Sequence, residues 1–279
     1  MAQRLIPSAG LGLKATERDR QFRLPACTAL LDAPLLPLGE PTVIKVELHS
    51  HTADDPCDYI PHSTCQLIDR SAQLGYQALA ITLHDRQLDL RPYAEFARQR
   101  GVTLIPGIER TIEGKHVLLL NFSGASEAVE TFDDLARLRA RERGLVIAPH
   151  PYFRTSTCLG GLLESYAELF DAVEYNAMFT ASLNLNDRAV RWALSHGKPL
   201  VGNGDVHRLR QLGTTYSLID APNDVDAICE AIRQNRVRVE ATPISALTAV
   251  GLVAEMLAAN LRTSSAGRSH SREHEYSTG

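Results

Sequence analysis

Short runs of apolar residues recur through the middle of the chain, and segments with helical spacing of apolar positions separate them. The apolar runs are residues 43–48, 78–83, 102–108, 117–122, 145–149, 172–173, 200–204 and 237–241. Runs of this kind, flanked by polar residues and turn formers, are typical of buried parallel strands. Their alternation with helices predicts an α/β fold built around a parallel sheet.

The helices between these strands carry start and stop signals. Ser63 is placed to cap a helix that stops at Gly75, and a helix over residues 186–196 stops at Gly197. Further helices are expected over residues 126–143, 224–235 and 245–261. The last of these is apolar, and we expect it to pack on the outside of this α/β fold or against a partner chain.

The chain divides into three parts by composition. Residues 1–41 have little periodicity and several Pro and Gly, which predicts an irregular lead-in that is partly packed through its leucines. Residues 42–262 hold the strand–helix alternation, and residues 263–279 are rich in Ser, Arg, His and Glu, which predicts a disordered tail. The sequence contains no stretch that predicts a membrane span or the apolar core of a signal peptide.

Composition and charge narrow the function classes. The 279 residues are 44% hydrophobic and 22% charged, as in globular proteins, and the formal net charge is -4. This charge argues against a large basic face for nucleic acid, but leaves room for a short oligonucleotide held by metals and a few arginines. The five cysteines are scattered and form no CxxC pair. This pattern predicts a protein without a disulfide framework, located in the reducing cytoplasm.

The residues that follow the apolar runs carry most of the candidate chemistry. The first run ends in His49-Ser50-His51, and side chains two residues apart on a strand point to the same side, where both imidazoles can bind one metal. The other runs are bounded by His84, Glu109, His116, His150, Glu174, Asp205 and His207. Because parallel α/β folds place their chemistry at strand carboxyl ends, this pattern predicts a metal site.

Six segments, in order, resemble the motifs of the PHP family (polymerase and histidinol phosphatase) of metal-dependent phosphoesterases. They are ELHSHT, AITLHD, IPGIE, HVLLL, APHP and GDVH, within about residues 43–215. The resemblance implies a distorted (β/α)7 TIM-like barrel. It also implies two to three divalent metal ions, Zn, Mn or Fe, in a cleft at the strand carboxyl ends.

The resemblance further implies which residues hold each metal. The first metal is assigned to His49, His51, Glu109 and Asp205, and the second shares Glu109 and adds His116 and His150. The third is assigned to His84, His207 and a residue after the first motif. Asp58 is preferred over Asp55 for that last ligand. The chain departs from the family at Leu83, where the family usually has Asp, and this leaves the hydrogen-bonding support of His84 open.

Paired divalent ions can acidify a water and stabilise charge on a phosphoryl group, so we expect a metal-bound hydroxide as nucleophile and no covalent intermediate. Asp205, as a proton acceptor, and His207 are the predicted catalytic residues. Arg154 and Arg208 are predicted to grip phosphate, although a surface ion pair is the competing interpretation for each. Glu174 is expected either to orient a ligand or contact substrate, or to be a buried structural carboxylate.

Three functions are compatible with this pattern. The first is a phosphoesterase acting on a small phosphomonoester, a nucleotide or the end of a short nucleic acid. The second is an amidohydrolase-type enzyme cleaving C–N or C–O bonds, which ranks lower because Glu109 takes the bridging role and no strand-end Lys is evident. The third is a non-catalytic PHP module. A homo-oligomer through the C-terminal helix is compatible with each of them.

Overall fold

The computed structural model describes residues 43–255 and residue 258. The predicted lead-in over residues 1–41, the tail over residues 263–279 and nearly all of the last predicted helix beyond residue 255 lie outside the described residues. The strands are β1 (Val43–Glu47), β2 (Ala78–Ile81), β3 (Thr103–Ile112), β4 (Lys115–Leu120), β5 (Leu145–Ala148), β6 (Ala172–Asn176), β7 (Leu200–Asn203), β8 (Thr215–Asp220) and β9 (Val237–Ala241). The α-helices are α1 (Thr64–Gln73), α2 (Ala94–Arg98), α3 (Phe132–Arg141), α4 (Leu162–Ser165), α5 (Asn186–His196) and α6 (Val225–Arg233), followed by helical residues 246–255.

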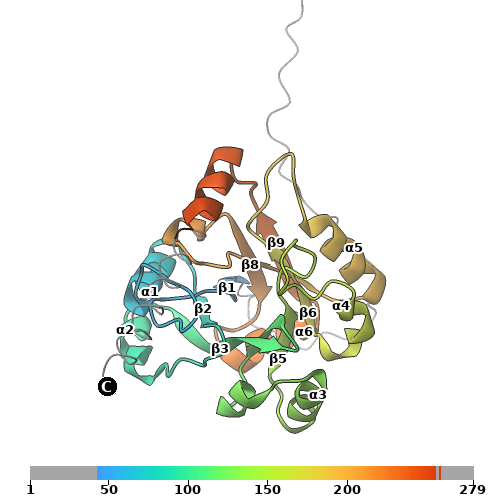
Figure 1. Cartoon of the computed structure of the whole chain (residues 1–279). Coiled ribbons are helices and arrows are strands. Elements are labelled where there is room, and N and C mark those ends of the chain that lie inside the picture. Colours follow the sequence, from blue (N-terminus) through green and yellow to red (C-terminus); the bar gives the residue numbers. More distant parts are fainter. Residues whose placement is uncertain (1–42, 256–257, 259–279) are drawn as a thin grey trace, which may run out of the picture. The chain divides into compact units, whose positions relative to one another are not determined.

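In the described residues, the strands form one curved sheet in the order β7-β6-β5-β4-β3-β2-β1-β8-β9 (Figure 1). The sheet closes where β7 meets β8. The Gly202 N–H donates to Ser217 Oγ (2.9 Å), and that hydroxyl donates to the Gly202 carbonyl (3.1 Å). Gly202 is required at this seam, because a Cβ there would lie 2.7 Å from the carbonyl oxygen of Tyr216. The predicted TIM-like α/β barrel is therefore confirmed, although its strand count differs from seven.

The expectation of parallel strands throughout is wrong at two strands, β4 and β8. β4 runs antiparallel to both β3 and β5, and β8 runs antiparallel to β1 and β9. The turn between β3 and β4 explains the first reversal, because Glu113 (φ 49°) and Gly114 (φ 76°) both have the left-handed backbone of a two-residue hairpin. β8 was not among the predicted strands, because its residues alternate between buried and half-buried and form no continuous apolar run.

Two helices match the sequence signals closely. Ser63 caps α1 in a capping box with Gln66, and Gly197 ends α5 with φ 62°. The helix expected over residues 126–143 is shorter: α3 begins at Phe132, because Thr131 and Asp134 form a capping box there.

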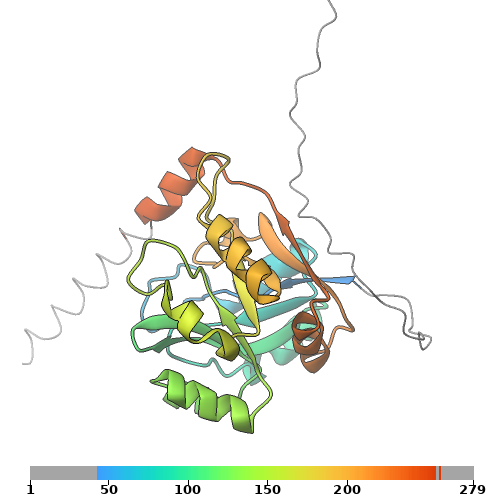
Figure 2. The same cartoon turned by 90° about the vertical axis from the view of Figure 1, so that its right-hand side faces the viewer.

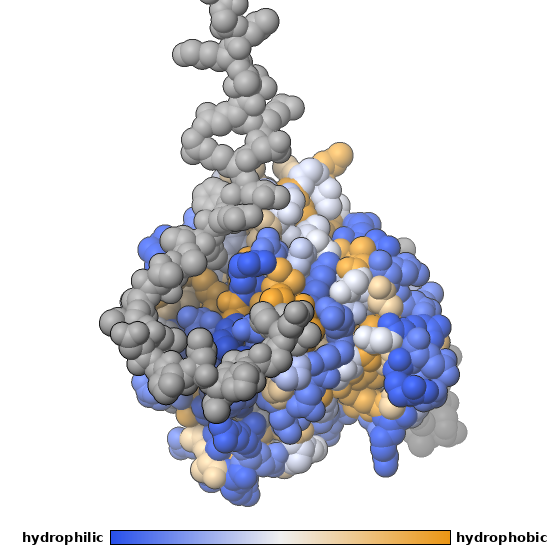
Figure 3. All heavy atoms as spheres, turned by 180° about the vertical axis from the view of Figure 1, so that it is seen from behind, coloured by the Kyte–Doolittle hydropathy of each residue, from blue (hydrophilic) through white to orange (hydrophobic). Residues whose placement is uncertain are grey.

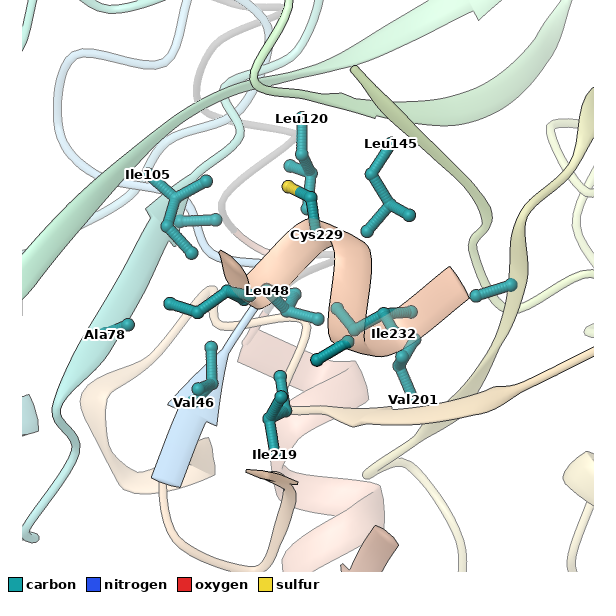
Figure 4. Close-up of a cluster of buried hydrophobic side chains, with 14 of the residues drawn as sticks. Val46, Leu48, Ala78, Ile105, Leu120, Leu145, Val201, Ile219, Cys229 and Ile232 are labelled. Carbon is teal, nitrogen blue, oxygen red and sulfur yellow. The ribbon is translucent and has the colours of Figure 1, made fainter. Parts of the chain in front are cut away.

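The interior at the amino ends of the parallel strands is closed by α6. Cys229 and Ile232 of this helix pack against Leu120, Leu145 and Ile105 of the barrel wall (Figure 4). The helix has polar ties to the same end, because Arg233 donates to the Gly144 carbonyl just before β5 (2.6 Å). The opposite, carboxyl end of the barrel is thereby left for the candidate site.

The outer surface carries helices and mixed side chains. Helices α1 and α2 lie on one flank of the barrel and α4 and α5 on the other (Figures 1 and 2). The rear face in Figure 3 mixes hydrophilic residues with smaller apolar patches. Among the described helices, none combines the length and the apolar character that crossing a membrane requires.

Candidate metal centre

Glu109, in the middle of β3, is the hub of the candidate site. Its carboxylate is 1% exposed, and five histidine nitrogens from separate parts of the chain surround it. The nitrogens near Oε2 are His84 Nε2 (3.1 Å), His49 Nε2 (3.2 Å) and His51 Nε2 (3.3 Å), and those near Oε1 are His116 Nδ1 (2.7 Å) and His150 Nε2 (3.3 Å). Each carboxylate oxygen thus faces a different set of imidazoles, which is the arrangement that a bridging ligand requires.

Asp205 brings a second carboxylate to the same place from the loop after β7. Its Oδ1 lies 3.3 Å from His207 Nδ1, 3.4 Å from His49 Nε2 and 3.6 Å from His51 Nε2. Its backbone has φ 48°, and His150 has φ 28°; both lie in the left-handed region that residues other than glycine rarely adopt. The chain accepts this backbone strain at two residues whose side chains point into the cluster.

Three polar atoms at the centre of the cluster are buried and, within the described residues, have no hydrogen-bond partner. They are His49 Nε2, His51 Nε2 and Asp205 Oδ1. Their short contacts with one another and with Glu109 lack the alignment of hydrogen bonds, and a buried polar atom without a partner is costly. Convergent imidazole nitrogens and carboxylate oxygens are suitable ligands for Zn, Mn or Fe, so the donor set fits a divalent ion.

The loop after His51 supplies two aspartates with different contacts. Asp58 Oδ2 lies 3.2 Å from His207 Nε2 and so faces the cluster. Asp55 Oδ2 lies instead behind the ring nitrogens of His51 (3.0 Å) and His84 (2.9 Å). Nitrogens of His51, His84 and His207 lie within 4.8 Å of one another, close enough to share an ion. The geometry is compatible with Asp58, rather than Asp55, as the ligand that joins His84 and His207 at the third ion.

Three further residues contact the cluster, and of these only Glu174 was a candidate from the sequence. Glu174 accepts from the His150 N–H (2.8 Å) and lies 3.3 Å from His49 Nδ1, which matches the ligand-orienting alternative for this residue. Asn176 donates to Asp205 Oδ2 (3.2 Å), and Cys158 Sγ lies 3.4 Å from His150 Nδ1. The only sequence signal for Asn176 was its place at a strand end, and Cys158 had none.

Glu47 is a further buried carboxylate, on β1 beside the cluster. It accepts from the backbone N–H groups of Gly204 (2.9 Å) and His49 (3.1 Å), and therefore ties the loop that carries Asp205 to the strand end that carries His49. Complete burial raises the pKa of Glu47 to about 8, against the lowering effect of these two N–H donors.

Burial and neighbouring charge act in opposite directions on the ionisable groups of the cluster. Burial would raise the pKa of Glu109 and of Asp205, yet the surrounding histidines hold both well below the usual range. Burial would lower the pKa of the histidines, but the carboxylates outweigh it and raise the pKa of His84 to about 11 and that of His207 to about 9. Protons and metal ions therefore compete for the same nitrogens.

The two arginines predicted to grip phosphate have different surroundings. Arg208 is 13% exposed; it donates to the carbonyls of His207 (2.7 Å) and Tyr59 (3.4 Å), and it pairs with Glu255 of the last described helix (3.4 Å). Arg154 is exposed on the loop that follows His150. The structure therefore holds Arg208 at the edge of the cluster and leaves Arg154 in solvent.

Comparison with known proteins agrees with this architecture. A family model described as PHP-associated matches residues 184–237, the segment that contains Asp205 and His207. Over 82 residues the chain is 32% identical to an error-prone DNA polymerase of Nocardia farcinica (strain IFM 10152); this covers 29% of the chain and 7% of the polymerase. The resemblance to the PHP family is confirmed.

Several solved structures are similar to the chain in three dimensions. A two-domain protein of Bacteroides vulgatus ATCC 8482, containing a predicted PHP-like metal-dependent phosphoesterase, matches with a TM-score of 0.56 and 18% identity over 77% of this chain and 70% of that one. PsfC from Pseudomonas syringae PB-5123 matches with a TM-score of 0.57 and 18% identity, over 79% and 99%. The lesion-specific endonuclease PfuEndoQ of Pyrococcus furiosus matches with a TM-score of 0.51 and 15% identity, over 76% of this chain and 66% of the endonuclease. At these identities the likeness concerns the fold alone.

Proposed function

We propose that this PHP-type chain is a metal-dependent phosphoesterase that hydrolyses a small phosphomonoester, a nucleotide or the end of a short nucleic acid. The observation that supports it best is the position of Glu109, whose two oxygens face two different groups of imidazoles. A site that divides its ligands in this way is suited to two adjacent ions and to phosphoryl transfer between them.

Two to three divalent ions, Zn, Mn or Fe, are the proposed cofactors. The proposed ligands of the first are His49, His51, Glu109 and Asp205; of the second, Glu109, His116 and His150; and of the third, His84, His207 and Asp58. When bound, such ions supply Lewis acidity and lower the pKa of a bound water. Buried atoms of His49, His51 and Asp205 that have no hydrogen-bond partner in the described part of the chain support this assignment.

The chain's own residues would then orient the reactants and move protons. The Asn176 amide fixes Asp205 Oδ2 (3.2 Å), which leaves Oδ1 directed at the cluster as the proposed proton acceptor. His207, whose ring lies between Asp205 and Asp58, is the second proposed catalytic residue, and as a proposed ligand of the third ion it would hold Asp205 in place beside that ion. For substrate binding we propose Arg154 and Arg208, the latter after exchanging its contact with Glu255 for phosphate.

The substrate class follows from size and charge. The net charge of -4 disfavours a long duplex, and only about forty residues separate Glu109 from His150, too few for a large substrate-binding insertion. Some relatives are named for action on DNA, so the end of a short nucleic acid stays within the proposal.

The proposal also includes a compartment and an assembly. The cysteines that the structure describes are free, as expected in the reducing cytoplasm that we propose. Helical residues 246–255 expose Leu247, Val250 and Val253, a spacing that supports a homo-oligomer through this helix. Light scattering of the wild type and of Leu247→Glu tests that assembly: loss of a dimer in the variant supports it, and a monomeric wild type excludes it.

The decisive experiment combines metal content with a phosphate-release screen over histidinol phosphate, nucleoside bisphosphates and short oligonucleotides. We expect two to three equivalents of metal, and turnover that is lost in His49→Ala but kept in His196→Ala, a matched histidine on α5 outside the cluster. Bound metal without phosphate release would favour the amidohydrolase-type alternative. A protein that binds no metal under any reconstitution would be a non-catalytic module.

A further inference from the structure

Asp55 contacts two histidines of the cluster, His51 and His84, from the side away from Glu109. Its Oδ2 lies 3.0 Å from His51 Nδ1 and 2.9 Å from His84 Nδ1, and it also accepts from the His84 backbone N–H (3.0 Å). The Asp55 side chain is fully buried. One oxygen therefore holds two imidazoles that come from different strands.

These contacts determine which ring nitrogen of each histidine faces the cluster. An imidazole that donates from Nδ1 keeps the lone pair on Nε2, and Nε2 of His51 and of His84 both point at Glu109 Oε2 (3.3 and 3.1 Å). A carboxylate behind a ligating histidine fixes its tautomer and its orientation and increases its basicity. Asp55 is in the position to do this for both rings at once.

The other oxygen of Asp55 shapes the loop that carries Asp58. Oδ1 accepts from the backbone N–H groups of Cys57 and Asp58, both at 2.9 Å, and the turn so formed directs Asp58 Oδ2 toward His207. The same carboxylate thus contacts two candidate ligands through its one oxygen and supports a third through the other.

Neighbouring residues in the sequence cannot take over this role for His84. Leu83 is completely buried in the apolar cluster beneath α1 and α2. Asp85 turns away and accepts from the Thr111 N–H (2.7 Å) and from Arg110 (2.6 Å). The hydrogen-bonding support that the Leu83 departure left open therefore comes from another loop, through Asp55.

We propose that Asp55 is a shared positioning residue, rather than a ligand, and that it couples the metal site containing His51 to the one containing His84. This inference rests on the proposed metal centre, but not on phosphoesterase activity. A terminal ligand such as Asp58 belongs to one ion, whereas a residue behind His51 and His84 influences two. Removing its charge should therefore weaken two binding steps together.

The test is a Mn²⁺ and Co²⁺ titration of the chelator-treated full chain, comparing wild type with Asp55→Asn, Asp58→Asn and Asp54→Asn. In Asp55→Asn we expect two binding steps to weaken together, by about 10- to 100-fold, the usual effect of losing a partner behind a metal ligand. The visible spectrum of bound Co²⁺ should change as well. In Asp58→Asn only one step should weaken.

Asp54→Asn is the matched control. Asp54 accepts from the hydroxyls of Thr52 and Thr64 (3.3 and 3.0 Å) and contacts no histidine of the cluster in the described residues. The substitution Asp54→Asn should therefore leave every metal-binding step unchanged. Thermal unfolding of each metal-free variant separates a folding defect from a metal effect, and the asparagine at position 55 keeps an acceptor for the loop. Weakening of a single step in Asp55→Asn, or of none, overturns the inference, as does a folded wild type that binds no metal. A wild type that binds metal but releases no phosphate overturns only the proposed function.

Discussion

The two ends of the barrel are both closely packed but chemically opposite. At the amino ends of the parallel strands, aliphatic residues of the wall and of α6 fill the interior. At the carboxyl ends, imidazoles and carboxylates are packed together, most of them buried, with polar atoms that have no protein partner in the described residues. The aliphatic end gains free energy from burial, whereas the polar end loses it until a ligand compensates. Stability and chemistry are thus assigned to separate ends of one sheet.

The largest effect is expected at the centre of the polar end. Glu109→Gln removes the charge that faces five histidines, and we expect activity to fall by more than the roughly 10- to 100-fold that loss of an outer partner costs. Metal content and phosphate release of the purified variant measure this. A variant that keeps both would remove Glu109 from the centre of the site.

Shortening a side chain at the aliphatic end should lower the stability of the protein and leave metal binding unchanged. Ile232→Ala leaves a cavity between α6 and the barrel wall, and we expect a loss of about 2–5 kcal/mol in the free energy of unfolding. Urea unfolding in chelator gives this value, while the metal affinity of the folded variant should match wild type. A large loss of affinity would show that the two ends are not independent.

Glu47, at the polar end, is expected to make the free energy of unfolding depend on pH. Its folded pKa of about 8 lies above the ordinary 4.5, so its contribution to stability is complete below about pH 4.5 and is lost as the pH rises through 8. For metal-free protein we expect the free energy of unfolding to fall by a few kcal/mol across that window. Glu47→Gln, which keeps an acceptor but cannot ionise, should flatten the profile. Parallel profiles for the two proteins would contradict this expectation.

The smallest effect is expected at the surface. Glu255, which is itself exposed, forms ion pairs with Arg208 (3.4 Å) and Arg210 (2.8 Å), so Glu255→Gln should change the free energy of unfolding by less than about 1 kcal/mol. It also frees Arg208, and for a phosphorylated substrate we expect a lower KM with little change in kcat. Glu95→Gln, which breaks a comparable pair with Arg98 on α2, is the control and should leave KM unchanged. An unchanged KM in Glu255→Gln would argue against Arg208 as a phosphate ligand.

Much of the cluster was predictable, because strand ends are visible in a sequence. A histidine or carboxylate directly after an apolar run has few other places to lie, and residues from His49 to His207 indeed converge. The reversal of β4 depended on one Glu-Gly turn, and β8 was hidden because half of its residues are only partly buried.

The residues behind the cluster were harder to predict. Asp54, Asp55 and Asp58 follow the same motif, and their sequence alone does not tell which aspartate faces the cluster. The outcome depends on the turn that the loop adopts, in which Asp55 accepts from two backbone N–H groups. Glu47 was passed over because it stands inside an apolar run, where only the packed barrel reveals its backbone partners.

The proposed donors are spread from His49 to His207, and this has a consequence for how the protein matures. A chain leaving the ribosome exposes His49 and His51 long before Asp205 has been synthesised, and a pair of imidazoles alone holds an ion only weakly. Tight capture of the first and third ions must wait until nearly the whole barrel has been translated and closed at its Gly202 seam, because their proposed ligands include Asp205 and His207. Metal retained at these two sites through purification would then indicate that the barrel has been completed.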